Sequence, residues 1–144
     1  MLRWTFAEML VVAFVTVGRA DSVQTELAKL QGKWSVEAIE ENGVKEPDEE
    51  AKRFQVTIKG TNFLVNVDGK EESMTIKIDP EKSPKTIDMT PNYGDDKGKI
   101  VPGIYELDGN KLRICACPKG DRPKKIASDK GMLILVLKRV AAEP

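Results

Sequence analysis

The sequence predicts an all-β domain: an antiparallel, up-and-down, eight-stranded barrel with a short N-terminal helix. Roughly eight segments alternate apolar and polar residues, which is the period of a strand with one buried face. Asp108-Gly109-Asn110 separates two apolar-rich segments, Ile100–Leu107 and Lys111–Cys115, and Asp-Gly favours the positive φ angles of a hairpin turn. Short connections make neighbouring strands antiparallel, and closure into a barrel removes exposed edges. A two-sheet sandwich is the competing arrangement.

The first twenty residues have the pattern of a secretory signal peptide. Arg3 supplies a positive charge, Met9–Val17 is an apolar segment, and the small residues Gly18 and Ala20 stand at positions −3 and −1 before Asp21. We expect cleavage before Asp21 and export to the periplasm or the medium, with an amphipathic N-terminal helix as the alternative. The apolar segment is shorter than the about 20 residues of a membrane span, so we expect no span after cleavage.

Composition describes one globular domain, residues 21–144, behind the signal peptide, residues 1–20. The chain has 144 residues, of which 40% are hydrophobic and 32% charged, with a formal net charge of +0. Balanced charge gives no reason to expect nucleic acid or an anionic membrane surface as a partner. The chain contains no histidine, which removes the usual general base and the commonest metal ligand. We therefore expect no metal, no cofactor and no enzymatic activity.

One helix is expected near the start of the mature chain, over Val23–Leu30. Ser22 is a suitable N-cap, and Val23, Leu27 and Leu30 share one helical face.

The strands are expected in order along the rest of the chain, each with an apolar face. Ile39 breaks the alternation of the first strand, in which Trp34, Val36 and Ala38 form that face. Residues 45–52 are charged and are expected to make one helical turn over an end of the fold. The last strand is apolar on both faces, so we expect the N-terminal helix to pack on its outside. The predicted strands are 33–41, 54–59, 63–67, 73–78, 87–89, 100–107, 111–115 and 132–140.

Gly32-Lys33-Trp34, at the start of the first strand and just after a short helix, resembles the Gly-x-Trp signature of lipocalins. In lipocalins the tryptophan closes one end of the barrel, and a basic residue of the last strand packs across it. Lys138 or Arg139 would be that residue here. We expect Arg139 to pack its stem on Trp34 and to pair with a nearby acid or carbonyl.

Five segments in order carry a second resemblance: LQGKWSVEAIEENG, IDMTPNYGDDKGK, GIYELDGNKLRIC, Arg122-Pro123 and LVLKR. Together they resemble a lipocalin-like domain family of unknown function that is abundant in planctomycete bacteria, often behind a signal peptide. The resemblance extends from Leu30 to Arg139. It implies an eight-stranded lipocalin-like barrel and brings no activity, ligand or functional residue. Cys115 fits the family pattern, whereas Cys117 is an addition.

The candidate ligand contacts are large side chains on the expected inward faces of the strands. An eight-stranded barrel either fills its interior with side chains or holds one small ligand, so the same residues can serve either purpose. They are Trp34, Phe54, Phe63, Met74, Met89 and Tyr105.

Cys115 and Cys117 lie two apart on one expected strand, so both point to the same face. Their Cα atoms would be about 6.5–7 Å apart, at the limit for a disulfide. Free or intermolecular thiols are the favoured interpretation, a strained disulfide is the second, and a metal or redox site is the least favoured.

Two polar loops are interpreted as solvated surface. Asp95-Asp96 lacks the regular spacing of a calcium loop, and Arg122, Lys124 and Lys125 form a small basic cluster rather than an anion site.

The sequence thus predicts an exported, non-enzymatic, lipocalin-like barrel that binds a small apolar or amphipathic molecule. The alternative is a cell-envelope protein–protein interaction module or inhibitor with a filled barrel, and a carboxylate-based enzyme is least favoured. A pocket of several hundred Å³ would favour the first, an exposed apolar patch the second, and carboxylates converging in the barrel mouth the third.

Overall fold

The computed structural model describes residues 19–141, so the expected signal peptide lies outside the described residues except for its last two, which begin the first helix. That helix starts earlier than the expected Val23. The elements in chain order are α1 (Arg19–Leu30), β1 (Gly32–Glu41), β2 (Val44–Lys45), α2 (Asp48–Ala51), β3 (Phe54–Lys59), β4 (Asn62–Val67), β5 (Lys70–Asp79), β6 (Thr86–Pro91), β7 (Val101–Asp108), β8 (Lys111–Ala116) and β9 (Leu133–Arg139).

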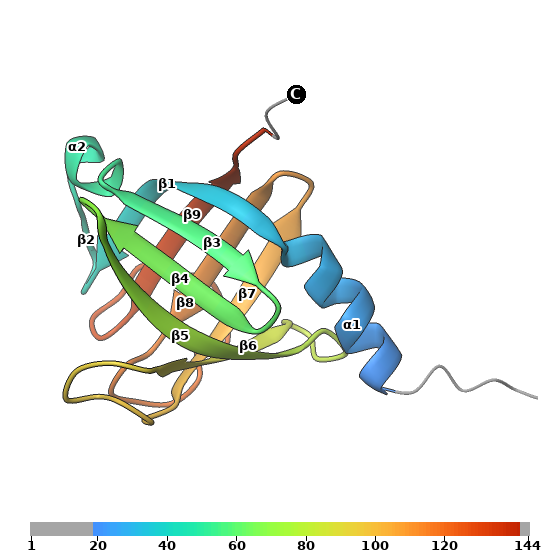
Figure 1. Cartoon of the computed structure of the whole chain (residues 1–144). Coiled ribbons are helices and arrows are strands. Elements are labelled where there is room, and N and C mark those ends of the chain that lie inside the picture. The colour runs from blue at the N-terminus through green and yellow to red at the C-terminus, as the bar shows by residue number, and fades with distance from the viewer. Residues whose placement is uncertain (1–18, 142–144) are drawn as a thin grey trace, which may run out of the picture.

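Eight of these strands, β1 and β3 to β9, form a closed antiparallel barrel (Figure 1). Each strand pairs with the next along the chain, and β1 also pairs with β9, which closes the ring. The short β2 pairs only with the end of β1. The predicted up-and-down barrel is therefore confirmed, and the sandwich is excluded.

The predicted tight turns join the strands as expected. Asp68 and Gly69 connect β4 to β5 with φ angles of 52° and 88°, and Gly109 between β7 and β8 has a φ of 57°. Two-residue turns with positive φ match the right-handed twist of the flanking strands. The hairpins therefore follow from local turn chemistry.

A β-bulge in β1 explains why Ile39 interrupts the alternation. The pairing of β1 with β9 shifts register between Val36 and Ala38. A bulge adds one residue to a strand and so switches which residues face the core. Ile39 is consequently buried in the core, whereas Ala38, expected on the inward face, is only partly buried.

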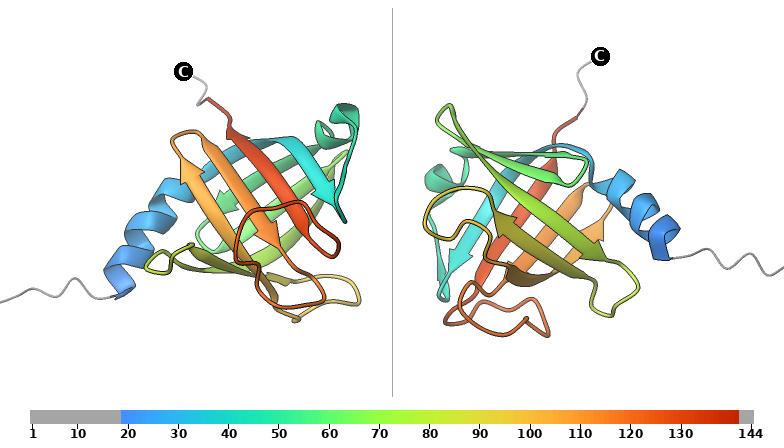
Figure 2. Two further views of the ribbon diagram at one scale, coloured as in Figure 1. Left: turned by 180° about the vertical axis from the view of Figure 1, so that it is seen from behind. Right: turned by 60° about the horizontal axis from the view of Figure 1, so that its bottom comes forward.

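The helix α1 covers one end of the barrel and does not pack on the outside of the last strand, which corrects our expectation (Figure 1). Leu27 and Leu30 are buried in the main core together with Trp34. We call this end, where β1 begins, the closed end, and the opposite end, where β1 finishes, the open end. The α2 turn lies at the open end, as Figure 2 also shows.

The loop between β8 and β9 covers the outer face of β9 instead. Ile126 and Met132 pack against Ile134 and Cys115 on the outer wall, where Figure 2 shows the loop crossing these strands. Arg122 holds the loop in place, donating hydrogen bonds to the carbonyl of Gly103 at 2.9 Å and to Asp88 Oδ1 at 2.6 Å. The outer face of the last strand is thus apolar because a loop buries it.

Candidate functional site

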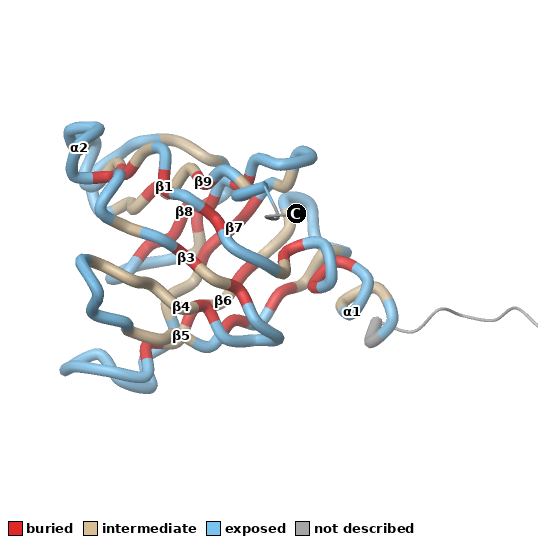
Figure 3. The backbone as a smooth tube through the Cα atoms, turned by 45° about the horizontal axis from the view of Figure 1, so that its top comes forward, coloured by how far each residue is buried: buried red, intermediate tan, exposed pale blue. Residues whose placement is uncertain are grey.

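The barrel interior contains a cavity of about 390 Å³ toward the open end. Several of its lining residues, among them Phe54, Val65 and Met74, are only partly buried. The colours in Figure 3 show how buried, intermediate and exposed residues follow one another along the strands. The lining residues are Val36, Ile39, Glu41, Phe54, Val56, Phe63, Val65, Met74, Met89, Tyr93, Asp96, Val101, Ile114, Ala116, Pro118, Leu133 and Leu135.

Four of the six candidate ligand residues line this cavity: Phe54, Phe63, Met74 and Met89. The other thirteen of the seventeen lining residues were not among the candidates. Most of them lie on the inward faces of the strands, where the alternation of the sequence already placed apolar residues.

Trp34 and Tyr105, the other two candidate ligand residues, do not line this cavity. Both are completely buried below it, toward the closed end. The Trp34 indole donates a hydrogen bond to the carbonyl of Leu30 at 2.9 Å, and the Tyr105 hydroxyl donates to Glu26 Oε1 at 3.2 Å. Their polar atoms are thus used to attach α1 to the barrel.

Three polar residues line the cavity although the sequence did not predict this position for them: Glu41, Tyr93 and Asp96. Glu41 is the last residue of β1, and its partner in β9, Leu133, also lines the cavity. Tyr93 and Asp96 belong to the loop between β6 and β7, which we interpreted as solvated surface. The inward position of Glu41 depends on the bulge in β1, which the sequence does not reveal. Nothing in the local sequence indicates that the loop between β6 and β7 reaches the open end of the cavity.

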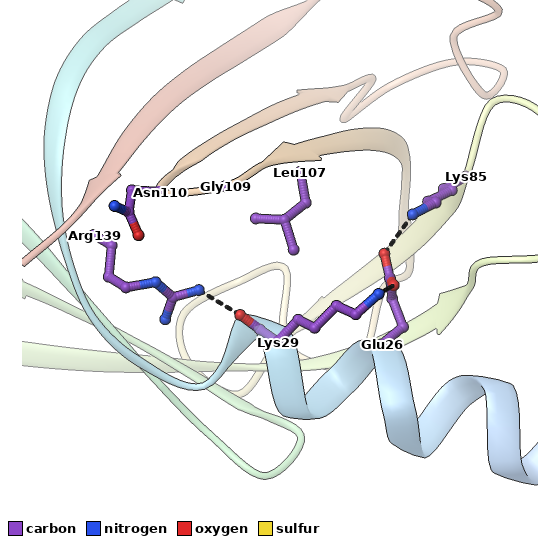
Figure 4. A pocket seen from close by; sticks show the side chains of 7 residues that line it. All are labelled: Glu26, Lys29, Lys85, Leu107, Gly109, Asn110 and Arg139. Atoms are coloured by element: carbon purple, nitrogen blue, oxygen red, sulfur yellow. Dashed lines mark hydrogen bonds and ion pairs between the residues drawn. The ribbon is translucent and has the colours of Figure 1, made fainter.

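A second, polar pocket of about 440 Å³ lies at the closed end, between α1 and the turn that joins β7 to β8. Figure 4 shows its lining residues, Glu26, Lys29, Lys85, Leu107, Gly109, Asn110 and Arg139. Three of its charged groups form ion pairs: Lys85 Nζ lies 2.6 Å and Lys29 Nζ 3.5 Å from the Glu26 carboxylate. Arg139 donates to the carbonyl of Gln31 at 2.7 Å and also to that of Lys29.

Glu26 is the single buried charged residue of the described chain, with 5% of its surface exposed. Burial opposes its ionisation, but the hydrogen bond and charge of Lys85, the charge of Lys29 and the hydrogen bond from Tyr105 outweigh burial and lower the pKa of Glu26. Burial, followed by the charge and hydrogen bond of Glu26, raises the pKa of Tyr105. Glu26 is therefore ionised and Tyr105 protonated at neutral pH. These contacts fasten the helix to the barrel.

Arg139, rather than Lys138, lies over Trp34, with its guanidinium carbon 4.3 Å from the centre of the indole ring. Gly32 provides the turn from α1 into β1 with a φ of 117°, a conformation that favours glycine. A Cβ atom at Gly32 would lie 3.6 Å from Arg139 Nη1. The Gly-x-Trp segment and the last strand thus close this end of the barrel together.

Cys115 and Cys117 are both buried and carry free thiols. Cys115 lies on the outer wall beneath the loop between β8 and β9. Burial is the main influence on the Cys115 thiol and raises its pKa. Among residues 19–141, no group of three or more acidic or cysteine side chains is arranged to hold a metal ion.

The closed antiparallel barrel of eight strands, with a helix at its N-terminal end, is consistent with a lipocalin-like fold. Comparisons with models of known protein families, with curated proteins and with solved structures found no match. In the described part of the chain, no helix has the length and apolar character needed to cross a membrane.

Proposed function

We propose that this protein is an exported carrier that binds a small apolar or amphipathic molecule inside its barrel. The observation that carries the proposal is the cavity of about 390 Å³. Its size falls within the about 300–1,000 Å³ of small-molecule sites, and such sites are mostly apolar with a few placed polar groups. The pattern of residues 1–20 supports export, and the resemblance to the planctomycete family supports a barrel that follows a signal peptide.

The polar residues of the lining favour binding over catalysis. Glu41 is exposed, and the Asp96 side chain is 75% exposed and lies 3.5 Å from Lys99 Nζ. Both side chains are open to solvent, whereas the acid of a carboxylate-based enzyme typically lies in an apolar pocket. The lining contains no cysteine, serine or lysine as a nucleophile. Two carboxylates at the mouth therefore suit recognition of a ligand rather than chemistry on it.

The interaction-module alternative has weaker support. The large apolar side chains that are exposed within residues 19–141 are Val44, Tyr93, Ile100 and Val140. Val44 belongs to β2, Tyr93 and Ile100 belong to the loop between β6 and β7, and Val140 follows β9 at the closed end, away from the others. Single exposed apolar residues are normal on soluble proteins, whereas partner sites present a contiguous patch.

Native mass spectrometry of the protein purified from its own cell envelope tests the proposal. We expect a reproducible mass above that of the polypeptide, released as a small apolar or amphipathic molecule on denaturation. A variant with the cavity filled, Val65→Phe with Val101→Phe, serves as the control and should carry no such molecule. Purification of the unaltered protein only at its bare mass, together with failure to bind any added amphiphile, would refute the carrier function.

A further inference from the structure

The ionisable side chains that line the cavity are all acidic. Glu41, Tyr93 and Asp96 are the ionisable residues of the lining, and no lysine or arginine of the described chain belongs to it. The whole chain, by contrast, has as many basic as acidic residues. The cavity therefore presents negative charge to a ligand although the protein as a whole is balanced.

The two carboxylates come from opposite sides of the mouth. Glu41 ends β1, and Asp96 lies in the loop that follows β6. In the closed ring, β3, β4 and β5 separate β1 from β6 on one side, and β7, β8 and β9 separate them on the other. A head group at the mouth would thus lie between Glu41 and Asp96, with its apolar body below them in the barrel.

Tyr93 adds an aromatic ring to this mouth, and its hydrogen bond with Glu72 adds a third carboxylate nearby. Tyr93 is 39% exposed. Burial raises the pKa of Tyr93, and the charge and hydrogen bond of Glu72 and the charge of Asp96 raise it further, so the phenol stays neutral. Glu72 lies opposite Val65 in the pairing of β4 with β5, and Val65 lines the cavity.

The cations near these acids lie at the protein surface. Lys70 Nζ is 3.4 Å from Glu72 with 80% of its side chain exposed, and Lys99 Nζ is 3.5 Å from Asp96 with 71% exposed. Exposed pairs of this kind hold weakly and exchange with other cations, because water and salt screen them. Both lysines can therefore turn into solvent when a cationic ligand approaches the mouth.

We infer that the ligand of this barrel is a cationic amphiphile, a molecule with an apolar body and an amine or quaternary ammonium head group. The inference rests on the proposed function, because it requires an occupied cavity. The body fills the apolar interior, and the head group lies between Glu41 and Asp96 beside the ring of Tyr93. An ammonium group at the mouth keeps much of its hydration, so it meets the carboxylates and the aromatic face without the full cost of burying a charge.

Three probes with the same octyl chain test the inference: octylammonium, octanol and octyl sulfate. Titration calorimetry at low salt measures the affinity of each for the mature protein. We expect octylammonium to bind about three- to tenfold more tightly than octanol, and octyl sulfate to bind more weakly than octanol. The preference for octylammonium should shrink as sodium chloride is added, because salt screens charges near the surface.

Substitutions test whether the preference for octylammonium depends on the carboxylates at the mouth. Glu41→Gln combined with Asp96→Asn should reduce the ratio of the octylammonium affinity to the octanol affinity to about one. Glu37→Gln is the matched control, since Glu37 is an exposed acid of the same strand that does not line the cavity. It should change neither affinity. Circular dichroism verifies that each variant keeps its strands.

The outcomes separate this inference from the proposed function. Binding of octanol without a preference for octylammonium, or a preference for octyl sulfate, would refute the cationic ligand and leave the carrier in place. A preference that persists at high salt or in the double variant would also refute it. Failure of all three probes to bind would refute the carrier function and the inference with it. The salt dependence of octylammonium binding by the unaltered protein tests the cationic ligand even if the double variant does not fold.

Discussion

The buried carboxylate of Glu26 gives the sharpest test of how α1 is attached to the barrel. Glu26 accepts hydrogen bonds from Lys85 at 2.6 Å and from Tyr105 at 3.2 Å. Glu26→Gln removes the charge and keeps the shape and one acceptor oxygen. The substitution therefore isolates the contribution of the charge.

We expect Glu26→Gln to lower the free energy of unfolding at pH 7 by about 1–2 kcal/mol. Hydrogen bonds to charged groups contribute about 1.5–3 kcal/mol. The loss falls toward the lower end because Lys85, 38% exposed, can turn into water, and because the amide oxygen still accepts from Tyr105. Glu106→Gln is the matched control: it breaks an exposed ion pair with Arg113 and should cost at most about 1 kcal/mol.

The pH dependence has a definite sign. The folded-state pKa of Glu26 is lowered, so its charge contributes fully above its unfolded-state pKa of 4.5. That contribution is lost as the pH falls through the lower, folded-state pKa. The difference in unfolding free energy between the unaltered protein and Glu26→Gln should therefore be constant near neutrality and shrink in acid.

Urea denaturation followed by tryptophan fluorescence measures these differences. In a chain that starts at residue 21, Trp34 is the sole tryptophan, and it is buried at the same end of the barrel. A loss no larger than that of Glu106→Gln at pH 7 would refute the role assigned to the Glu26 charge. A difference that stays constant or grows below pH 4 would refute it as well.

Three further predictions concern packing and the thiols. Gly103→Ala should destabilise the protein by about 1–3 kcal/mol in urea denaturation, because the new Cβ would lie 2.9 Å from the carbonyl oxygen of Cys115; unchanged stability would contradict this close approach. Arg139→Lys should cost about 1–2 kcal/mol, because lysine cannot donate in a fork to the carbonyls of Lys29 and Gln31; equal denaturation midpoints would show that these bonds contribute nothing. The Cys115 thiol, with its pKa raised by burial, should react with iodoacetamide much more slowly in the native protein than in urea, as peptide mass mapping will show; equal rates would contradict its burial.

The parts of the fold that the sequence predicts are those set by local chemistry. Alternation with a period of two fixes which residues of a regular strand face inward, and Asp68-Gly69 and Gly109 fix where hairpins turn. The bulge in β1 depends on pairing with β9, the strand farthest from it along the chain. For that reason Ile39 stood out as an exception without revealing its cause.

The element that covers the last strand differs from the predicted one for a related reason. A strand that is apolar on both faces requires some partner outside the barrel, and α1 was the one amphipathic segment that the pattern offered. The loop between β8 and β9 provides that partner through Ile126 and Met132. Isolated apolar residues in a polar loop have no periodicity, so their burial cannot be predicted from the segment itself.

The same distinction applies to the cavity. Its strand residues, such as Phe63 and Met74, follow from alternation, whereas Tyr93 and Asp96 reach the mouth only because the loop after β6 folds over it. The sequence could therefore predict an apolar interior but not the acidic residues at its entrance.

The sizes of the inward side chains explain why one end of the barrel is filled and the other is not. Trp34 and Tyr105 are among the largest completely buried side chains, and both lie toward the closed end. Toward the open end the inward positions include the smaller residues Ala116, Val65 and Val101 beside larger ones such as Phe54 and Met74. An eight-stranded barrel is just wide enough for side chains to fill it, so small residues at one end leave a space there. The tight packing at the closed end and the ion pairs of α1 stabilise the fold and offset the contacts that are missing around the cavity at the open end. A cavity at the open end is thus compatible with a stable fold.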